Sequence, residues 1–355
     1  MHLIRVRFAA IPTILLVATS AAFSQSASVR AAAPLNMPAP VDSNSPGYWM
    51  NGDFHLLNST GNGPMRADGT NQNRLGVPES VRINRIHPWP TWIEAVWVDS
   101  NGIIFAWYHQ EQPSGCPGRS LAVPHIGEAI SYDGGNSFQD MGTIISSPVA
   151  PDCQSQNGYF AGGNGDVSVI RDQNSEYFYF LFTNYAGPKS HQGIALARMP
   201  FASRYNPVGA VQKYFQGDFT EPGENGRVTA IFPAKVRWEQ PNADSFWGPS
   251  IHWNTYLNSY VMLLNHSCCT PGFPQEGIYV TFGADLSNPA SWTAPVKLMD
   301  NSGWYPQVLG GGKDGSDTLA GRTPRLYIYG QSQWQIVFDK ASAAAPLNPQ
   351  QPSAP

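Results

Sequence analysis

The chain has 355 residues, of which 21 are Lys or Arg and 25 are Asp or Glu, so its formal net charge is -4. Charged residues make up only 13% and aromatic residues 12%, and the chain contains 34 Gly and 31 Pro. This composition argues against a helical bundle, global disorder and a nucleic-acid partner bound through phosphate neutralisation. It favours a turn-rich, aromatic-rich, all-β protein.

The first residues have the pattern of an export signal. Two Arg residues precede an apolar run from Phe8 to Phe23, and the small residues around Ser24 suit cleavage before Gln25. The run is interrupted by a proline, which makes it a poor match to a membrane anchor. We therefore predict a signal peptide over residues 1–24, a secreted or periplasmic protein, and no membrane span.

Two segments rich in Ala, Ser and Pro flank the remainder of the chain. Such segments cannot bury a core, so we expect a linker over residues 25–40 and a disordered tail over residues 341–355. Residues 41–340 are left to form the folded domain.

Four cysteines in an exported chain allow disulfides. Cys116 and Cys153 both lie in Pro- and Gly-rich loop sequence, and we predict a bridge between them. Cys268 and Cys269 are adjacent, so they form either a vicinal disulfide or two thiols. No Cys-x-x-Cys pattern is present, and we predict no structural metal site on these residues.

A short apolar run that ends in polar residues recurs five times along the folded part. The five runs are FHLLNST (54–60), IFAWYHQ (104–110), FYFLFTNY (178–185), YVMLLNHS (260–267) and RLYIYGQS (325–332). Turn signals such as Asn51-Gly52 precede these runs, and most units have a further short strand on either side. Three or four antiparallel strands repeated five times predict an all-β fold, a single five-bladed β-propeller. A β-sandwich is the alternative, but it would not predict five similar units.

Two local motifs add a family resemblance. Residues Ser131 to Phe138 resemble the Asp-box of sialidases and other propellers, in which Asp133 would be a turn residue rather than a catalyst. Residues Ala284 to Pro289, followed by Trp292, resemble a "D-L-x-N-P-x-x-W" turn of five-bladed glycoside hydrolases. With the blade openings VDSNSPGYW, GNGDVSVI and WGPSIHWN, the chain resembles the broad clan that includes glycoside hydrolase families 43 and 32.

The resemblance implies that acids at blade openings converge on a central funnel. Those acids are Asp42, Glu94 and Asp166 in blades one, two and three. Glycoside hydrolysis needs one carboxylic acid to protonate the leaving oxygen and one carboxylate to activate water or attack the sugar. Family 43 enzymes are inverting and take a base Asp, a modulator Asp and an acid Glu from these blades in that order. Here Glu and Asp are exchanged, and we predict Asp42 as base, Glu94 as acid and Asp166 as modulator or substrate ligand.

Each of these acids also has a structural interpretation. Asp42 could cap a turn, and Asp166 follows glycines that could simply form a bulge. Glu94 lies within the apolar strand TWIEAVWV, where an isolated acid is costly unless it faces a wet cavity. Glu128 opens a third strand and is the reserve acid.

Further residues are candidates for substrate binding. His252 resembles the histidine that family 43 enzymes place near the funnel centre in blade four. No cofactor is expected from the resemblance other than a possible calcium ion at that centre. Amphipathic aromatic faces stack on sugar rings, and Arg322 could clamp substrate. The full set of candidates is His252, Trp92, Trp247, Trp304, Tyr305 and Arg322. Core packing is the alternative for the aromatic residues and for His252.

Two classes of function fit the sequence. The first is a secreted glycoside hydrolase, with a glycan as its partner. The second is a non-catalytic propeller that binds sugar or protein, because a fold does not imply a function. An enzyme needs at least two clustered carboxylates in the funnel, whereas a binding propeller needs none.

Overall fold

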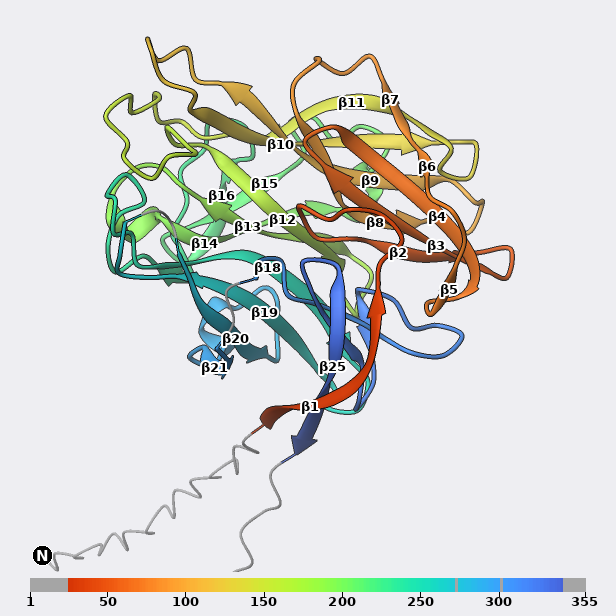
Figure 1. Cartoon of the computed structure of the whole chain (residues 1–355). Helices are drawn as coiled ribbons and strands as arrows, with labels where there is room; N and C mark the ends of the chain where they lie inside the picture. Colours follow the sequence, from red (N-terminus) through yellow and green to blue (C-terminus); the bar gives the residue numbers. More distant parts are fainter. Residues whose placement is uncertain (1–24, 272–273, 301–302, 341–355) are drawn as a thin grey trace, which may run out of the picture.

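The computed structural model describes residues 25–271, 274–300 and 303–340. Five β-sheets surround one axis, and the ends of the described chain meet in one of them (Figure 1). The predicted five-bladed propeller is confirmed, and the β-sandwich alternative is wrong. The predicted signal peptide and C-terminal tail lie outside the described residues.

The blades follow one another in chain order. Blade one contains β2 (Gly47–Met50), β3 (Asp53–Thr60), β4 (Gly63–Asn71), β5 (Arg74–Leu75) and β6 (Glu79–Ser80). Blade two contains β8 (Thr91–Val98), β9 (Ile104–Pro113), β10 (Ala122–Ser131), β11 (Ser137–Ile145) and β7 (Arg82–Asn84). Blade three contains β12 (Asn164–Arg171), β13 (Tyr177–Asn184), β14 (Gly193–Pro200), β15 (Gln212–Phe215), β16 (Asp218–Pro222) and β17 (Phe232–Pro233).

Blades four and five complete the ring. Blade four contains β18 (Ser245–Asn254), β19 (Ser259–Ser267), β20 (Gln275–Gly283), β21 (Val296–Met299) and β23 (Leu319–Ala320). Blade five contains β22 (Gln307–Leu309), β24 (Arg325–Ile328), β25 (Gln331–Lys340) and β1 (Gln25–Asn36). Three short 3-10 turns lie in connections, namely η1 (Lys189–His191), η2 (Phe201–Ser203) and η3 (Pro289–Ser291). None of the helical segments in the described residues is long and apolar enough to cross a membrane.

The blades are held together by apolar residues that alternate along each strand. In β13, Phe178, Phe180 and Phe182 pack toward blade two, whereas Tyr179 and Leu181 pack toward blade four. Successive side chains of a strand point to opposite faces of its sheet, so a sheet between two neighbours is apolar on both faces. Full burial of one such side chain contributes about 1.5–3 kcal/mol, and every blade interface buries several.

The segment expected to be a linker is instead part of the fold. Strand β1 pairs antiparallel with β25 from Gln25, opposite Lys340, to Asn36, opposite Gln331. Val29 packs against the core between blades four and five. Composition misled the sequence prediction, because an edge strand with only one packed face can consist largely of small and polar residues.

Two disulfides and one hydrogen-bonded turn hold the loops. Cys116 and Cys153 are bonded, with their Cα atoms 5.3 Å apart, as predicted, and Cys268 is bonded to Cys269. In the Asp-box-like turn, the Asp133 carboxylate accepts hydrogen bonds from the Ser137 backbone N–H at 3.0 Å. Asp133 is therefore a turn residue, as its motif indicates.

Candidate active site

Two of the predicted acids are the extra residues of β-bulges in neighbouring inner strands. The register of β8 against β9 shifts between Ile93 and Ala95, and that of β12 against β13 shifts between Gly165 and Val167. Glu94 and Asp166 are therefore the unpaired residues at these two places. A bulge changes the direction of a side chain, and Asp166 has a positive φ of 47°. Such backbone conformations are costly for a residue other than glycine and are often found at functional sites.

The two bulged acids and one histidine form a connected group. His109 of β9 has its Nδ1 3.4 Å from Glu94 Oε1 and 3.4 Å from the backbone N of Asp166. The backbone N–H of Val167 donates to Glu94 Oε2, and the Tyr185 hydroxyl donates to Asp166 Oδ2. Glu94 and Asp166 are only 2% and 3% exposed, so these contacts replace water as their hydrogen-bond partners.

Glycine allows β12 to approach this group closely. A Cβ on Gly165 would lie 3.1 Å from His109 Nε2 and 3.0 Å from Pro124 Cβ. Gly163 has a positive φ of 101°, and a Cβ there would lie 2.6 Å from the Pro124 carbonyl oxygen. The glycines before Asp166 therefore allow this acid to approach blade two. The bulge at Asp166 is part of how the site is built.

Two further carboxylates, those of Asp42 and Glu111, lie near His109 on its more solvent-exposed side. Asp42 precedes β2 and is half-buried, and its backbone N–H donates to the Ser59 carbonyl at 2.8 Å. Glu111 has a side chain 26% exposed, with Oε1 3.7 Å from His109 Nε2. Sequence reasoning missed Glu111. The available signal was its position two residues after His109, which puts both on one face of β9.

Burial and mutual repulsion raise the pKa values of these acids. Burial raises the pKa of Glu94 to about 8, and the charge of Asp42 adds to this rise. Burial likewise raises the pKa of Asp166 to about 7, where Glu94 and Asp42 add to the rise and His109 opposes it. The pKa values of Asp42 and Glu111 are also raised, chiefly by burial. One or more of these groups therefore holds a proton near neutral pH.

Two of the predicted aromatic residues, Trp92 and Tyr305, lie beside the acids, and Trp247 and Trp304 adjoin Tyr305. Trp92 stacks on the His109 ring at a centroid distance of 5.1 Å. Its indole lowers the pKa of Asp42 against the effect of burial, although Nε1 makes no hydrogen bond within ordinary limits. The Tyr305 ring lies 5.6 Å from that of Trp247, and Trp247 in turn lies 5.6 Å from Trp304. Burial raises the pKa of Tyr305, and the charges of Asp166, Asp42 and Glu94 raise it further, so this ring is close to the acid group.

Three predicted site residues lie elsewhere. Glu128 is fully buried between blades two and three, where its Oε2 accepts a hydrogen bond from Trp107 Nε1 at 2.8 Å. His252 packs against Phe338 of blade five at 5.7 Å, and burial alone lowers its pKa to about 3. Arg322 pairs with Asp339 at 2.5 Å on the exposed side of blade five. The structure therefore does not bring Glu128, His252 or Arg322 together with the group of acids around His109. For Glu128 and His252 the reason is strand direction: their side chains project into the packing between blades rather than toward the axis.

Glu94, His109 and Asp166 also form a group that could hold a metal ion, since their ligand atoms lie within 4.8 Å of one another. Calcium takes six to eight oxygen ligands. Here one donor is an imidazole nitrogen, and one oxygen of each carboxylate already accepts a hydrogen bond from Val167 or Tyr185. This group of three residues therefore does not fit the central calcium that the resemblance left open.

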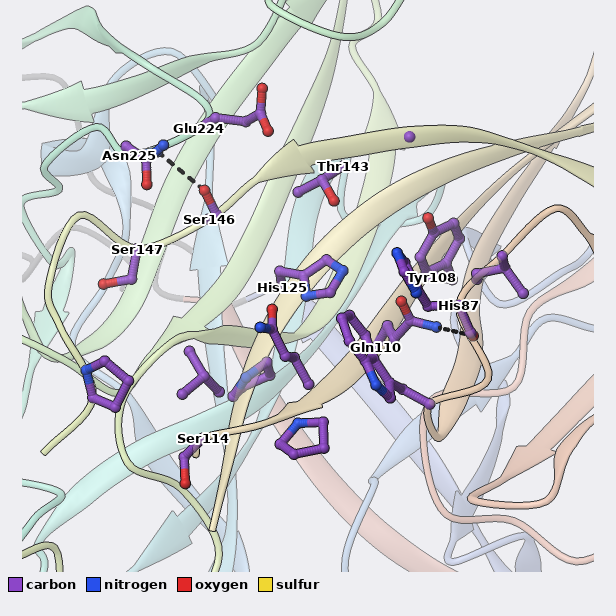
Figure 2. Close-up of a pocket in the computed structure, with 18 of the residues that line it drawn as sticks. His87, Tyr108, Gln110, Ser114, His125, Thr143, Ser146, Ser147, Glu224 and Asn225 are labelled. Carbon is purple, nitrogen blue, oxygen red and sulfur yellow. Dashed lines mark hydrogen bonds between the residues drawn. The ribbon is translucent and has the colours of Figure 1, made fainter. Parts of the chain in front are cut away.

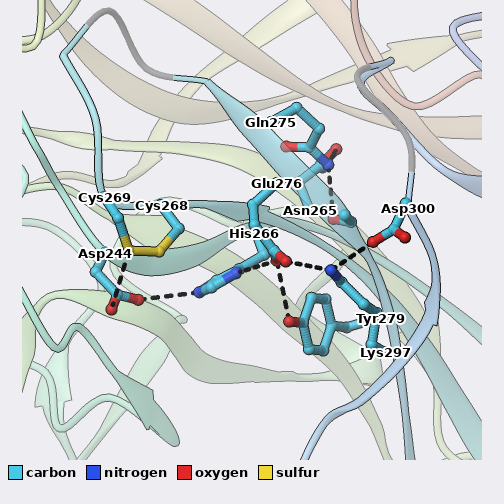
Figure 3. A network of polar contacts seen from close by, with 11 residues as sticks. Asp244, Asn265, His266, Cys268, Cys269, Gln275, Glu276, Tyr279, Lys297 and Asp300 are labelled. Atoms are coloured by element: carbon cyan, nitrogen blue, oxygen red, sulfur yellow. Dashed lines mark hydrogen bonds and ion pairs between the residues drawn. A yellow bond between two sulfur atoms is a disulfide. The ribbon is translucent and has the colours of Figure 1, made fainter.

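A second group of charged residues, at the rim of blade four, is fully paired (Figure 3). His266 lies between Glu276, 2.8 Å from Nδ1, and Asp244, 3.0 Å from Nε2. Lys297 bridges Glu276 and Asp300. Burial opposes ionisation of Glu276, but hydrogen bonds from Lys297, His266 and Tyr279 lower its pKa to about 2. A carboxylate held ionised in this way stabilises the blade and is not poised for proton transfer.

Solved structures with the same fold are glycoside hydrolases by their descriptions. An endo-arabinase from Bacteroides thetaiotaomicron is 11% identical, with a TM-score of 0.50, and the match covers 87% of this chain and 97% of that one. A putative exo-β-1,3-galactanase from Bifidobacterium bifidum is 13% identical, with a TM-score of 0.51, and the match covers 90% and 94%. The fold is that of the five-bladed glycoside hydrolases.

Another similar structure, described as a thermostable family-43 glycoside hydrolase, is 12% identical, with a TM-score of 0.48 over 86% of this chain and 92% of that one. No protein-family model and no curated protein sequence matches the chain. The two structures with TM-scores of 0.50 and 0.51 confirm the predicted resemblance to five-bladed glycoside hydrolases at the level of fold.

Proposed function

We propose that the protein is an exported glycoside hydrolase that cleaves oligo- or polysaccharides at the group formed by Asp42, Glu94, Glu111 and Asp166. The observation that carries the proposal is the convergence of carboxylates from three blades on one histidine, with pKa values near neutrality for the two most buried acids. Hydrolysis of a glycosidic bond requires both a protonated and an ionised carboxyl group at the same pH.

The proposed roles follow from burial and charge. Glu94, with a pKa of about 8, holds its proton at neutral pH and is the general acid. Asp42 is half-buried, so water can reach it, and it is the general base of an inverting reaction. The charges of Glu94 and Asp42 both raise the pKa of Asp166. Asp166 in turn modulates the protonation of Glu94 and Asp42. Glu111 replaces Glu128 as the reserve acid, because it is the more exposed neighbour of His109.

The aromatic residues would position the sugar. Tyr305, Trp247 and Trp304 form adjoining rings beside the acids. Trp304 and Tyr305 are partly exposed, and their apolar faces suit the C–H face of a sugar ring, while the acids and His109 supply hydrogen-bond partners for hydroxyl groups. This combination favours a glycan over a protein partner.

The test is incubation of the purified protein with a panel that includes arabinan and β-1,3-galactan, followed by analysis of the released sugars and of their initial anomeric form. We expect release of sugar with inversion, and loss of release in Glu94→Gln. The absence of any released sugar across the panel, with tight binding of a glycan retained, would identify a non-catalytic binding propeller instead.

A further inference from the structure

The hairpin formed by β9 and β10 carries two different sets of polar side chains on its two faces. His109 and Glu111 lie on the face toward the acid group. Gln110 and Gln112, which alternate with them, lie on the other face opposite His125 and Val123. These side chains line a separate cavity of about 660 Å³ between blades two and three (Figure 2). A cavity of this size is within the range of ordinary ligand sites.

The cavity wall opposite the β9–β10 hairpin is held in place by hydrogen bonds and a disulfide. The side chains that we expect to face a ligand take no part in these bonds. Lys213 donates to the carbonyl oxygens of Ser146 and Gly226 at 2.6 and 3.0 Å, and to Asn164 at 3.2 Å. The Asn225 backbone N–H donates to Ser146 as well (Figure 2). The Cys116–Cys153 disulfide joins the hairpin loop to the segment that continues this wall. The cavity is therefore preformed, which lowers the entropic cost of binding.

Several polar groups in the cavity have no partner among the described residues. The side chains of His125, Gln112 and Glu224 line it and make no hydrogen bond to another described residue. Asp140 has one carboxylate oxygen engaged, by Tyr108 at 2.6 Å and by the Gly142 N–H at 3.0 Å, and its second oxygen is free to accept. Imidazole, amide and carboxylate groups of this kind bind vicinal hydroxyl groups.

Trp89 supplies the aromatic surface of the cavity and extends it. One face of its indole stacks on His87 at 4.5 Å, and it meets the His125 ring edge-on at 6.2 Å. Trp89 and His87 also line a second cavity of about 390 Å³ that continues toward blade one. This pair of rings lines both cavities, so a ligand that fills both must be elongated.

The charged residues that line the larger cavity indicate which class of ligand it can bind. Its lining includes Asp140 and Glu224 and no Lys or Arg, all of it within the described part of the chain. Such a surface repels uronate or sulfate groups and accepts neutral hydroxyls. An aromatic ring with uncharged and acidic hydrogen-bonding groups around it suits a neutral sugar chain.

We infer that this groove, defined by Trp89, Gln112, His125, Asp140 and Glu224, is a second glycan-binding site that holds a neutral polysaccharide chain away from the acid group. The inference rests on the proposed function for the identity of the glycan. A chain anchored here stays near the funnel between cleavage events, so the site raises the local concentration of polymer without contacting the reacting bond.

The test is affinity electrophoresis with soluble arabinan and β-1,3-galactan, with polygalacturonate as the acidic polymer. It uses a Glu94→Gln background, so that the polymer stays intact. We expect Trp89→Ala to weaken binding of the neutral polymer that slows migration of the parent protein by about tenfold. The double variant Gln112→Ala, Glu224→Ala should weaken this binding as well. The double variant removes only groups without intramolecular hydrogen bonds, so it keeps the test meaningful if Trp89→Ala folds poorly. Tyr132→Ala, an exposed aromatic 68% accessible on another turn, is the matched control and should bind like the parent.

The outcomes separate the two proposals. Unchanged retardation in both groove variants, or equal retardation by polygalacturonate, overturns the second site even if the wild-type protein releases sugars. Groove-dependent retardation without sugar release by the wild-type protein supports the second site and overturns the proposed hydrolase. A panel in which no neutral polymer is retarded also overturns the second site.

Discussion

The Glu94 carboxylate accepts a hydrogen bond from the backbone N–H of Val167, the residue directly after Asp166. This bond ties the bulge of β8 to the bulge of β12 across the interface of blades two and three. The position of one acid therefore depends on the other, and His109 contacts both. A change at Glu94 acts on two properties, proton donation and the geometry of the neighbouring bulge, and the choice of substitution separates them.

Glu94→Gln should lower turnover of natural glycans by on the order of 100-fold or more, because the amide cannot supply the proton. The amide oxygen can still accept from Val167, so thermal stability should change little. Glu94→Ala should lose both activity and stability, since it leaves the Val167 N–H unpaired in a buried site. Rates on aryl glycosides with good leaving groups, which need little protonation, should be partly spared in Glu94→Gln. Full activity of this variant on natural glycans would transfer the acid role to Glu111, to be tested by Glu111→Gln.

The rate should depend on pH in a bell-shaped manner. The general acid must be protonated, so turnover of natural substrates should fall as pH rises through the Glu94 pKa of about 8. The general base must be ionised, so turnover should also fall on the acidic side, as Asp42 takes up its proton at a pKa above its ordinary 3.8. Steady-state rates between pH 3 and 10 on a natural and an activated substrate check this, because only the natural substrate should show a strong alkaline limb. An alkaline limb of equal size on both would argue against Glu94 as proton donor.

Two residues, Glu94 and Glu276, should make the free energy of unfolding depend on pH in opposite directions. Glu94 has a pKa of about 8 in the folded state against 4.5 in the unfolded state, so the folded protein binds the extra proton between these values. The free energy of unfolding should then decrease as pH rises from 4.5 to 8, and Glu94→Gln should reduce this slope. Glu276, with a folded pKa of about 2, has the opposite effect: its contribution is present above pH 4.5 and is lost as pH falls toward 2. Urea unfolding at several pH values, with Glu276→Gln as the second variant, measures both slopes.

The two disulfides should contribute unequally to stability. Cys116 and Cys153 are 37 residues apart in sequence, so their bond restricts the unfolded chain by about 3–4 kcal/mol in the loop-entropy model. Cys268 and Cys269 are adjacent, and closing so small a loop removes little chain entropy. The double Ser variant of the first pair should therefore unfold at markedly lower urea concentration, while the double Ser variant of the second pair should stay close to the parent. Equal losses in the two variants would contradict this account.

Gly165→Ala should disturb the acid group without touching a carboxylate. The added methyl group would lie 3.1 Å from His109 Nε2, so the imidazole, which contacts both Glu94 and Asp166, must shift. We expect a lower turnover and a shifted pH profile. Gly311→Ala is a matched control, because Gly311, like Gly165, has no positive φ, but no atom lies within 4 Å of the added methyl group, and its turnover should be unchanged. A parent-like pH profile in Gly165→Ala would mean that His109 does not influence the acids.

Much of the architecture follows from local sequence pattern, and the failures have physical causes. The five apolar runs predict the second strands because each is buried on both faces, and Glu94 was recognisable as an acid inside such a strand. Glu128 was equally conspicuous, yet strand register alone cannot say which face meets the axis. Glu94 itself is turned to its neighbours by a bulge, which depends on pairing with β9. His109 and Glu111 were not among the predicted site residues, because they belong to a second strand and only the close approach of glycine-rich β12 brings them into the site.

The pairing of β1 with β25 has a consequence for how the chain matures. Arg30 and Gln335 are hydrogen-bonded partners separated by 305 positions along the sequence. A chain is made from its N-terminus, so β1 emerges long before its partner β25, and four blades are made between them. Until then the backbone donors and acceptors of β1 are an open edge, of the kind that pairs readily with other chains. Ring closure is thus a late event that depends on contacts of very long sequence separation, which are slow to form. Assembly of this protein should accordingly be sensitive to concentration and to anything that shields the first strand while the remaining blades are being completed.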